Sequence, residues 1–437
     1  MSDMYSRVRD GLHSLKSLLI HGRFHSPKWD YSHHIVPPLS MNAAYRLETV
    51  ERGGLGFQQF ANLEYSTRGE EPIYIYDRLH EPTKGMLEER IAFAEKCEVG
   101  ISFASGMAAI ASVLLATLKA GDELVIHKTL YGCTYSLVTR WLPRWGIKVH
   151  LVDFTKPDEV AAATNERTRV YYFETPVNPN LTLIDVEKVV SLARDQSAGR
   201  DEADRIRTIV DNTFASPWCQ RPKELGVDFV AASLTKHITG FGTDVGGIVC
   251  GDLKDEPTLL LARKDIGGSL GSHAAWGILT YGLPTLPLRM QKATENCGLL
   301  ARYLEAHPKV DRVLWPGLEH FPDREIALKQ MRDPEGRFAP ASVLYFVLKG
   351  DDAEAQARGR KLLNYIAKNA YTMTLAVSLG QIRTLIEHPS SMTHAAVPLE
   401  EQLAVGIDPG GIRVAVGIED VNDIIRDLDA AFNALDA

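Results

Sequence analysis

The chain has 437 residues, of which 45% are hydrophobic and 24% charged, and its formal net charge at pH 7 is -8. This length exceeds what one hydrophobic core usually supports, so we expect two domains. The acidic balance provides no basic surface for nucleic acid or anionic lipid, and no apolar run has the length needed to cross a bilayer. We therefore expect neither nucleic acid nor membrane as a partner.

Five cysteines are scattered along the chain without the CxxC spacing of redox or zinc sites: Cys97, Cys133, Cys219, Cys250 and Cys297. This usage is typical of reduced thiols, and we expect no metal site. The first 26 residues carry charges throughout and lack a long apolar stretch with a small-residue cleavage site. We therefore expect a cytoplasmic protein.

The chain begins with a segment of no sustained period and then alternates regularly. Residues 1 to about 75 contain proline, glycine and aromatic residues in irregular order, which predicts an arm. From residue 84 the pattern predicts helices at 84–97 and 106–120 and strands at 99–105, 122–128, 148–154, 168–176, 206–214 and 229–236. Strands that alternate with helices predict a mostly parallel sheet covered on both faces.

The pattern of helical and strand periodicity changes near residue 288. It predicts helices at 290–308 and 353–370 and strands at 341–349, 374–380 and 410–418. We expect a smaller α/β domain with antiparallel strands. The predicted division is therefore an N-terminal arm at 1–79, a larger domain at 80–287 and a C-terminal domain at 288–437.

The stretch "SLTKHITGFGTDVGG" (233–247) places one lysine among hydroxyl groups and glycines. The preceding strand delivers Ser233, Thr235 and Lys236 to its carboxyl end, which is where ligands bind in an open α/β sheet. A solvated surface lysine is the more common use of this residue.

Other predicted strand ends carry groups suited to a ligand. The backbone N–H groups of Gly106 and Met107 begin a helix and suit a phosphate, although the same pattern forms ordinary helix caps. Asp211 ends an apolar strand and would suit a protonated ring nitrogen, or cap a turn. Asn178 lies in a loop that a plain turn also explains, and Tyr131 would stack on a ring or pack in the core.

Together with the runs "EHPSSMTHAAVP" and "GGIRVAVGIED", these motifs resemble the pyridoxal 5'-phosphate enzymes of cysteine and methionine metabolism. The resemblance is to the cystathionine γ-synthase and methionine γ-lyase group, and it extends from about Tyr76 to Asp420. It implies pyridoxal 5'-phosphate as cofactor and the aspartate aminotransferase type I fold. That fold is α/β, with a mostly parallel sheet and a smaller C-terminal α/β domain.

The resemblance assigns roles to residues of this sequence. Lys236 would form the Schiff base, Asp211 would face the pyridine nitrogen and Asn178 the ring hydroxyl. Tyr131 would stack on the ring and protonate the leaving group at Cγ. The phosphate would be held by Gly106, Met107, Ser233 and Thr235.

The resemblance also implies substrate contacts and an oligomer. Arg413 would bind the substrate carboxylate with two parallel hydrogen bonds, and Ser378 would orient that arginine and Lys236. Tyr76 and Arg78 would reach the phosphate from a neighbouring subunit, so we expect a homodimer or homotetramer with shared active sites.

Two short motifs favour the methionine γ-lyase branch. Cys133 in "YGCT" and Lys264-Asp265 in "RKDIGG" stand where those lyases carry a cysteine and a Lys-Asp pair. The expected reaction is γ-elimination on a γ-substituted L-amino acid, with cleavage of a carbon–sulfur or carbon–oxygen bond. A small core cysteine and an exposed ion pair explain the same residues without a substrate.

Departures from the family pattern leave the substrate open. Glu81 replaces a neutral amide, Phe241 replaces a histidine, and Tyr281 replaces an arginine. An added carboxylate would favour a polar or cationic distal group, such as the guanidinooxy group of canavanine. Alternatively, Glu81 faces solvent or pairs with Arg78.

Two other functions remain open from the sequence. One is γ-replacement on an O-acyl-homoserine, as in a sulfhydrylase or a cystathionine γ-synthase, because the same residues serve both reactions. The other is a catalytically silent binding protein on the same fold. The presence of Lys236, Asp211, Tyr131 and Arg413 together argues against a silent protein.

Overall fold

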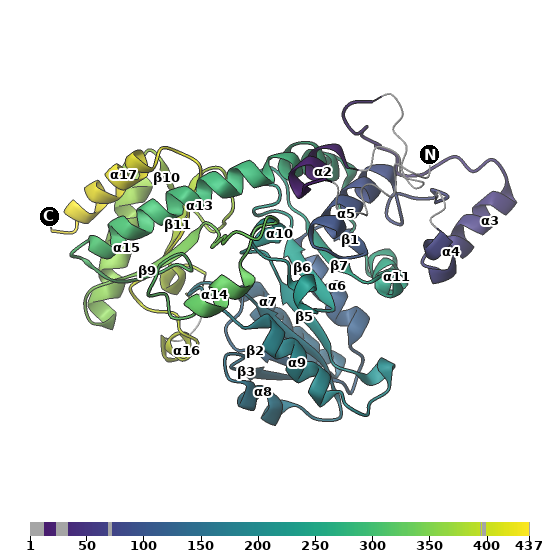
Figure 1. Cartoon of the computed structure of the whole chain (residues 1–437), viewed down its shortest axis with the longest axis horizontal. Coiled ribbons are helices and arrows are strands. Elements are labelled where there is room, and N and C mark those ends of the chain that lie inside the picture. The colour runs from purple at the N-terminus through teal and green to yellow at the C-terminus, as the bar shows by residue number, and fades with distance from the viewer. Residues whose placement is uncertain (1–12, 23–33, 69–71, 394, 396–398, 437) are drawn as a thin grey trace.

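The computed structural model describes residues 13–22, 34–68, 72–393, 395 and 399–436, and it contains two sheets with helices packed on them (Figure 1). The larger sheet is seven-stranded in the order β1-β7-β6-β5-β4-β2-β3. Its strands are β1 Val99–Phe103, β2 Glu123–His127, β3 Lys148–Val152, β4 Thr168–Glu174, β5 Arg207–Asp211, β6 Phe229–Ser233 and β7 Gly247–Gly251. β7 is antiparallel to both its neighbours, and the other pairings are parallel, which confirms the predicted mostly parallel sheet.

Helices cover both faces of this sheet, as the near-continuous apolar strands require. Buried side chains of α6 Gly106–Thr117 and α11 Glu256–Ile266 pack on one face. The other face is covered by α8 Pro157–Ala163 and α9 Val186–Gln196 at one end and by α5 Pro82–Ala94 at the other. The carboxyl ends of the parallel strands stay open between these layers.

The smaller sheet has the order β10-β11-β12-β9-β8 and is antiparallel except between β10 and β11. Its strands are β8 Val310–Leu314, β9 Val343–Leu348, β10 Met373–Leu375, β11 Thr384–Glu387 and β12 Gly411–Ala415. The helices α13 Leu283–Ala306, α15 Asp352–Asn369 and α17 Val421–Asn433 pack beside it (Figure 1). The proposed division at residue 288 falls inside α13.

The remaining helices are short. Those after the N-terminal region are α7 Gly132–Ser136, α10 Ser216–Cys219, α12 Ser272–Gly277, α14 Arg324–Gln330 and α16 Leu399–Ala404. Single helical turns and short π-helices, such as Leu137–Trp141 and Ile278–Gly282, connect them. No helix in the described part of the chain combines the length and apolar character needed to span a membrane.

The N-terminal region contains helices, so the expectation of an irregular segment up to residue 75 is wrong for three stretches. These are α2 Leu15–His21, α3 Val50–Gln59 and α4 Leu63–Arg68. The hydroxyl of Thr49 accepts the N–H of Arg52 at 3.0 Å and caps α3, a signal that glycines inside the helix obscure in the sequence.

The structure differs from the predicted strands at two places near the open end of the larger sheet. β7 was not predicted, because its two end glycines weaken the strand pattern. Gly247 is required there, since a Cβ atom would lie 2.2 Å from the carbonyl oxygen of Ser105. The predicted strand 374–380 ends at Leu375 in β10, and the irregular residues that follow reach the cavity described below.

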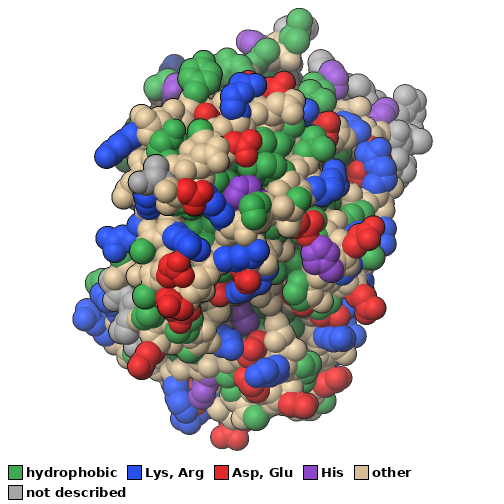
Figure 2. Space-filling model, turned by 90° about the vertical axis from the view of Figure 1, so that its left-hand side faces the viewer, with side chains coloured by type: hydrophobic (Ala, Val, Ile, Leu, Met, Phe, Trp, Pro, Cys, Tyr) green, Lys and Arg blue, Asp and Glu red, His purple; other side chains and the backbone are tan. Residues whose placement is uncertain are grey.

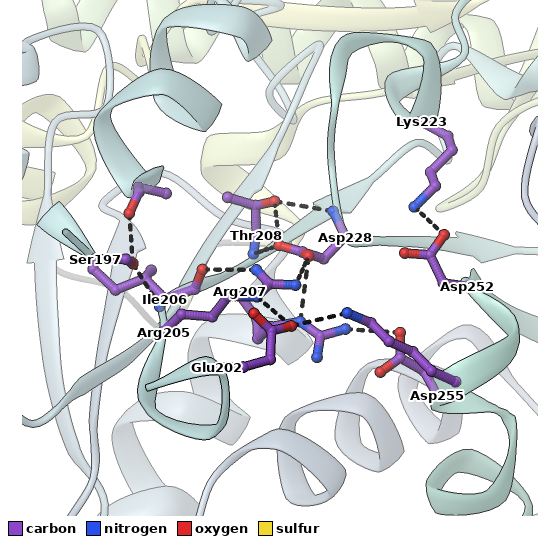
Figure 3. Close-up of polar contacts among 12 residues, drawn as sticks. Ser197, Glu202, Arg205, Ile206, Arg207, Thr208, Lys223, Asp228, Asp252 and Asp255 are labelled. Carbon is purple, nitrogen blue, oxygen red and sulfur yellow. Dashed lines mark hydrogen bonds and ion pairs between the residues drawn. The ribbon is translucent and has the colours of Figure 1, made fainter. Parts of the chain in front are cut away.

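Ion pairs fix the opposite, amino-terminal ends of β5 and β6 (Figure 3). Arg205 contacts Asp228 at 2.5 Å and Glu202 at 2.9 Å, and Arg207 contacts Asp255 at 2.7 Å. Positive and negative side chains are likewise interspersed over the face of the molecule in Figure 2. The charged side chains named at this end of the sheet are therefore paired with one another.

Candidate active site

A cavity of about 300 Å³ lies where the carboxyl ends of β4, β5 and β6 meet residues of the smaller sheet. Residues far apart in the sequence meet there because both sheets contribute. The predicted site residues that line it are Gly106, Met107, Tyr131, Asn178, Asp211, Ser233, Thr235, Lys236, Ser378 and Arg413. The structure therefore brings most of the predicted set together, while the role of each residue stays a prediction.

Lys236 follows β6 and is partly buried in the cavity. Its Nζ lies 2.9 Å from Ser378 Oγ. Burial lowers the pKa of Lys236, and the positive charge of Arg413 lowers it further. A lysine with a lowered pKa supplies the uncharged amine that attacks a carbonyl carbon.

Asp211 ends β5 and faces the cavity, where its Oδ1 accepts the N–H of Thr213 at 2.9 Å. Burial raises the pKa of Asp211, because the carboxylate has little solvent around it, and no cation pairs with it among the residues that the structure describes. A protonated ring nitrogen would supply that missing positive charge. This unmet need fits the pyridine ring of pyridoxal 5'-phosphate.

Glu174 is a second buried carboxyl group in the cavity, and sequence reasoning missed it. It pairs with Asp211 in the register of β4 and β5, and its Oε1 accepts the N–H of Tyr131 at 2.9 Å. Burial raises the pKa of Glu174 well above its usual value, with the charge of Asp211 as a further cause. We expect it to hold a proton and leave the negative charge on Asp211.

Tyr131 lies at the start of α7 with its side chain 40% exposed. Its hydroxyl accepts a hydrogen bond from Cys133 Sγ at 3.4 Å. Burial raises the pKa of Tyr131, so the phenol keeps its proton at neutral pH and is suited to donate it.

Arg413 lies in β12 and is 4% exposed. Its guanidinium donates to Asn178 Oδ1 at 3.0 Å and to the carbonyl oxygen of Ser378 at 2.9 Å. Glu387, the residue opposite it in β11, lies 3.0 Å from the same guanidinium and was also missed by sequence reasoning. Arg413 Nε has no hydrogen-bond partner among the described residues, so this donor remains for a ligand.

The start of α6 forms the third part of the site. Ser105 Oγ accepts the N–H of Ala108 at 3.1 Å, which caps the helix and directs its positive end at the cavity. Gly106 is needed because a Cβ atom would lie 2.9 Å from Ser233 Cβ. With the hydroxyl groups of Ser233 and Thr235 lining the same wall, this end of the cavity fits a phosphate.

Tyr76 and Arg78 do not line the cavity of their own chain. Both side chains are exposed, and the guanidinium of Arg78 donates to the carbonyl oxygen of Lys264 and lies 5.6 Å from the Tyr76 ring centre. This position leaves open the predicted contact with a neighbouring subunit. Cys133 is exposed beside Tyr131 and touches the site through that hydroxyl.

The structure corrects the assignment of Glu81 to the substrate. Its side chain is 0% exposed, and its two carboxylate oxygens accept the N–H groups of Thr83 and Lys84, each at 2.7 Å. Glu81 therefore caps α5, and it neither faces solvent nor pairs with Arg78. A residue enclosed within its own chain has no access to a substrate in this subunit or in a neighbouring one.

Comparisons with known proteins agree with this geometry. Residues 16–433 match the family described as Cys/Met metabolism PLP-dependent enzyme. An L-methionine gamma-lyase of Fusobacterium nucleatum subsp. polymorphum is 41% identical over 397 residues, which cover 90% of this chain and 92% of that protein. A cystathionine beta-lyase of Coxiella burnetii is 38% identical over 363 residues, which cover 82% of this chain and 87% of that protein. The crystal structure of cystathionine gamma-lyase from Lactobacillus plantarum complexed with L-serine superposes with a TM-score of 0.83 at 30% identity, covering 97% of this chain and 100% of that one.

Proposed function

Because this chain belongs to the Cys/Met metabolism PLP-dependent enzyme family, and therefore uses pyridoxal 5'-phosphate, we propose that it catalyses γ-elimination on a γ-substituted L-amino acid. The proposed substrate is of the methionine type, and the products are a thiol, a 2-oxo acid and ammonia. The observation that carries the proposal is the similarity to L-methionine gamma-lyases at 36% to 41% identity over at least 90% of the chain.

The walls of the cavity support an apolar distal group on the substrate. Ile110, Phe214, Val245, Val377 and Leu379 line it, so a methylthio group would meet hydrocarbon there. Removal of Glu81 from the site also removes the carboxylate on which the canavanine hypothesis depended. A thioether is therefore the preferred substrate class.

Residues from both sheets would bind the substrate and the cofactor. Arg413 would hold the substrate carboxylate, using the Nε donor that has no hydrogen-bond partner in the described part of the chain. Asn178 and Ser378 fix the guanidinium by accepting two of its other hydrogen bonds. Asp211 would keep its negative charge directed at the ring nitrogen, and Tyr131 would cover the ring face.

Lys236 and Tyr131 would carry out the proton transfers of the reaction. When bound, the cofactor supplies an aldehyde for the substrate amine and a ring that accepts the electron pair of the Cα–H bond. Lys236 Nζ, whose pKa is lowered by burial and by the charge of Arg413, would take the Cα proton and then move a proton at Cβ. The Tyr131 hydroxyl would protonate the sulfur as the bond to Cγ breaks.

We also propose that the protein works as a homodimer or a pair of homodimers. Exposed apolar side chains in the N-terminal region support an interface there: Ile35 is 95% exposed, Met41 70%, Val50 88% and Phe57 61%. Tyr76 and Arg78, which lie outside their own cavity, would complete the phosphate site of the partner.

The test is the identity of the carbon product from a panel of substrates. Purified protein is incubated with methionine, cystathionine, canavanine and O-acetylhomoserine with sulfide, and the products are identified by mass. We expect 2-oxobutanoate from methionine. Homocysteine from O-acetylhomoserine without any 2-oxo acid would replace the proposal with γ-replacement, and pyruvate from cystathionine alone would replace it with β-elimination.

A further inference from the structure

The segment that contains Tyr76 and Arg78 has two alternating sides. Tyr76 and Arg78 are exposed, whereas Leu79 is buried and Asp77 is partly buried. The carbonyl oxygen of Tyr76 accepts the N–H of Leu79 at 2.9 Å, so the segment is a turn that is held on one side and presents the other to solvent. The residues that hold the inner side therefore decide where Tyr76 and Arg78 lie.

Lys84 is the residue that holds Asp77. Its Nζ donates to the carbonyl oxygen of Asp77 and lies 3.1 Å from the Asp77 carboxylate. It also donates to Ser269 Oγ at 2.9 Å. Lys84 thus connects the segment before α5 to the loop between α11 and α12.

Burial and the helix dipole make the position of Lys84 energetically unfavourable for a cation. This indicates that its contacts serve a structural role. The residue is 0% exposed and is the third residue of α5, where the helix dipole disfavours positive charge. Burial lowers the pKa of Lys84, and the nearby Arg263 adds repulsion. A buried ion pair of this kind stabilises a fold little compared with apolar residues, but it fixes geometry.

Further contacts secure both ends of this connection. Arg263 donates to the carbonyl oxygen of Leu79 at 2.7 Å, and the Asp77 carboxylate accepts from Ser272 Oγ at 3.3 Å. On the far side of Ser269, the carbonyl oxygen of Gly268 accepts the N–H of Ala104, just before the start of α6. Lys84 therefore ties the segment to a loop that is itself anchored on the larger sheet.

We infer that Lys84, through its ion pair with Asp77, is a positioning residue that presents Tyr76 and Arg78 to the cofactor phosphate of the neighbouring subunit. This inference rests on the proposed sharing of active sites. Lys84 touches neither substrate nor cofactor, and it acts across the interface. Its loss therefore harms the partner's cavity and leaves the cavity of its own chain intact.

The first variant is Lys84→Met, which keeps the length of the side chain and removes its charge and donors. Because removal of one partner leaves the Asp77 carboxylate without its cation, a second variant, Lys84→Met with Asp77→Asn, removes both charges. Lys156→Met, at an exposed position, is the matched control. We expect the dissociation constant of pyridoxal 5'-phosphate, measured by absorbance titration, to rise about tenfold in both Lys84 variants and to stay unchanged in the control.

Mixed oligomers decide whether Lys84 acts across the interface. Lys84→Met subunits are co-expressed with Lys236→Ala subunits under different tags, and oligomers that carry both tags are purified. One cavity then combines an intact Lys236 with an intact segment from the partner. We expect turnover per such cavity to return to the wild-type value.

The comparison with Arg78 separates the inference from its premise. If Arg78→Ala with Lys236→Ala recovers activity but Lys84→Met with Lys236→Ala does not, Lys84 acts within its own chain and the inference is wrong while sharing stands. If neither mixture recovers, the sharing of sites is wrong as well. If cofactor affinity is unchanged in both Lys84 variants, the positioning role is excluded directly.

Discussion

The side-chain amine of Lys236 lies 2.9 Å from the hydroxyl of Ser378, although the first follows a strand of the larger sheet and the second a strand of the smaller one. The carbonyl oxygen of Ser378 also accepts a hydrogen bond from Arg413. One residue therefore sets the distance between the predicted nucleophile and the predicted carboxylate-binding group. A shift of the smaller sheet would move Ser378 and Arg413 together relative to the Lys236 amine, so substrate binding and amine placement are coupled.

Lys236→Ala should lose covalently held cofactor. Protein purified with pyridoxal 5'-phosphate should absorb visible light, and borohydride should fix the cofactor on Lys236, because this is the amine in the cavity with a lowered pKa. The Ala variant should release the cofactor on dialysis and show no fixed label by peptide mass. Retention of a borohydride-fixed label on another residue would remove Lys236 from its proposed role.

Arg78→Ala should weaken cofactor binding without changing the fold of its own chain, since the side chain is exposed and outside its own cavity. Random mixing with Lys236→Ala subunits should restore activity in about a quarter of all sites, because half of the dimers are mixed and each has one intact site. Activity is measured before and after the two variants are dissociated and reassembled. A mixture that stays inactive contradicts the shared site.

The sequence predicted the strand ends because small and apolar residues lead directly into polar ones at Asp211 and Lys236. It did not predict Glu174 or Glu387. A glutamate within a strand pattern indicates solvent, and only the register of neighbouring strands places these two beside Asp211 and Arg413.

The assignment of Glu81 to the substrate overlooked a helix-start signal in the sequence. Pro82 stands at the first position of α5, and a proline there often marks the residue before it as the helix cap. The capping role of Glu81 was therefore visible in the sequence, whereas its departure from the family motif suggested a contact with substrate.

Alkylation should inactivate the protein through Cys133. It is the exposed cysteine, and Cys97, Cys219, Cys250 and Cys297 are buried. Iodoacetamide should label Cys133 first, and the added group would displace the Tyr131 hydroxyl, which lies 3.4 Å away. Displacement of a proton donor by about 1 Å can cost a hundredfold in rate, so turnover should fall by at least tenfold.

Cys133→Ala provides the control for that experiment. It should keep most of its activity, since alanine occupies less space beside Tyr131, and it should resist iodoacetamide. Label on Cys133 with full activity would show that Tyr131 is not disturbed from there, and inactivation of the Ala variant at the same rate would assign the effect to another residue.

Glu95 should make the stability of the protein fall between about pH 5 and pH 8. The side chain is 0% exposed, and both its oxygens lie 3.1 Å from the side-chain amide of Asn212, the residue after Asp211. Burial raises the pKa of Glu95 to about 8 from its ordinary value of 4.5. In that window the folded chain holds a proton that the unfolded chain has released, so each rise in pH favours unfolding. The stabilisation is complete below the unfolded pKa and is lost as the pH passes the folded one.

Glu95→Gln tests this prediction, because an amide oxygen still accepts from Asn212 and does not titrate. Unfolding free energies from urea titrations at pH 5, 6, 7 and 8 should fall for the wild type relative to Glu95→Gln, by a difference of the order of a few kcal/mol across the window. Glu325→Gln, at an exposed position, should run parallel to the wild type. If the Glu95→Gln curve also ran parallel to the wild type, the proton would reside on a different group. Because Glu95 holds the residue next to Asp211, loss of its proton in the folded chain should loosen the Asp211 loop, so cofactor affinity should decline as the pH rises through about 8 in the wild type and stay level in Glu95→Gln.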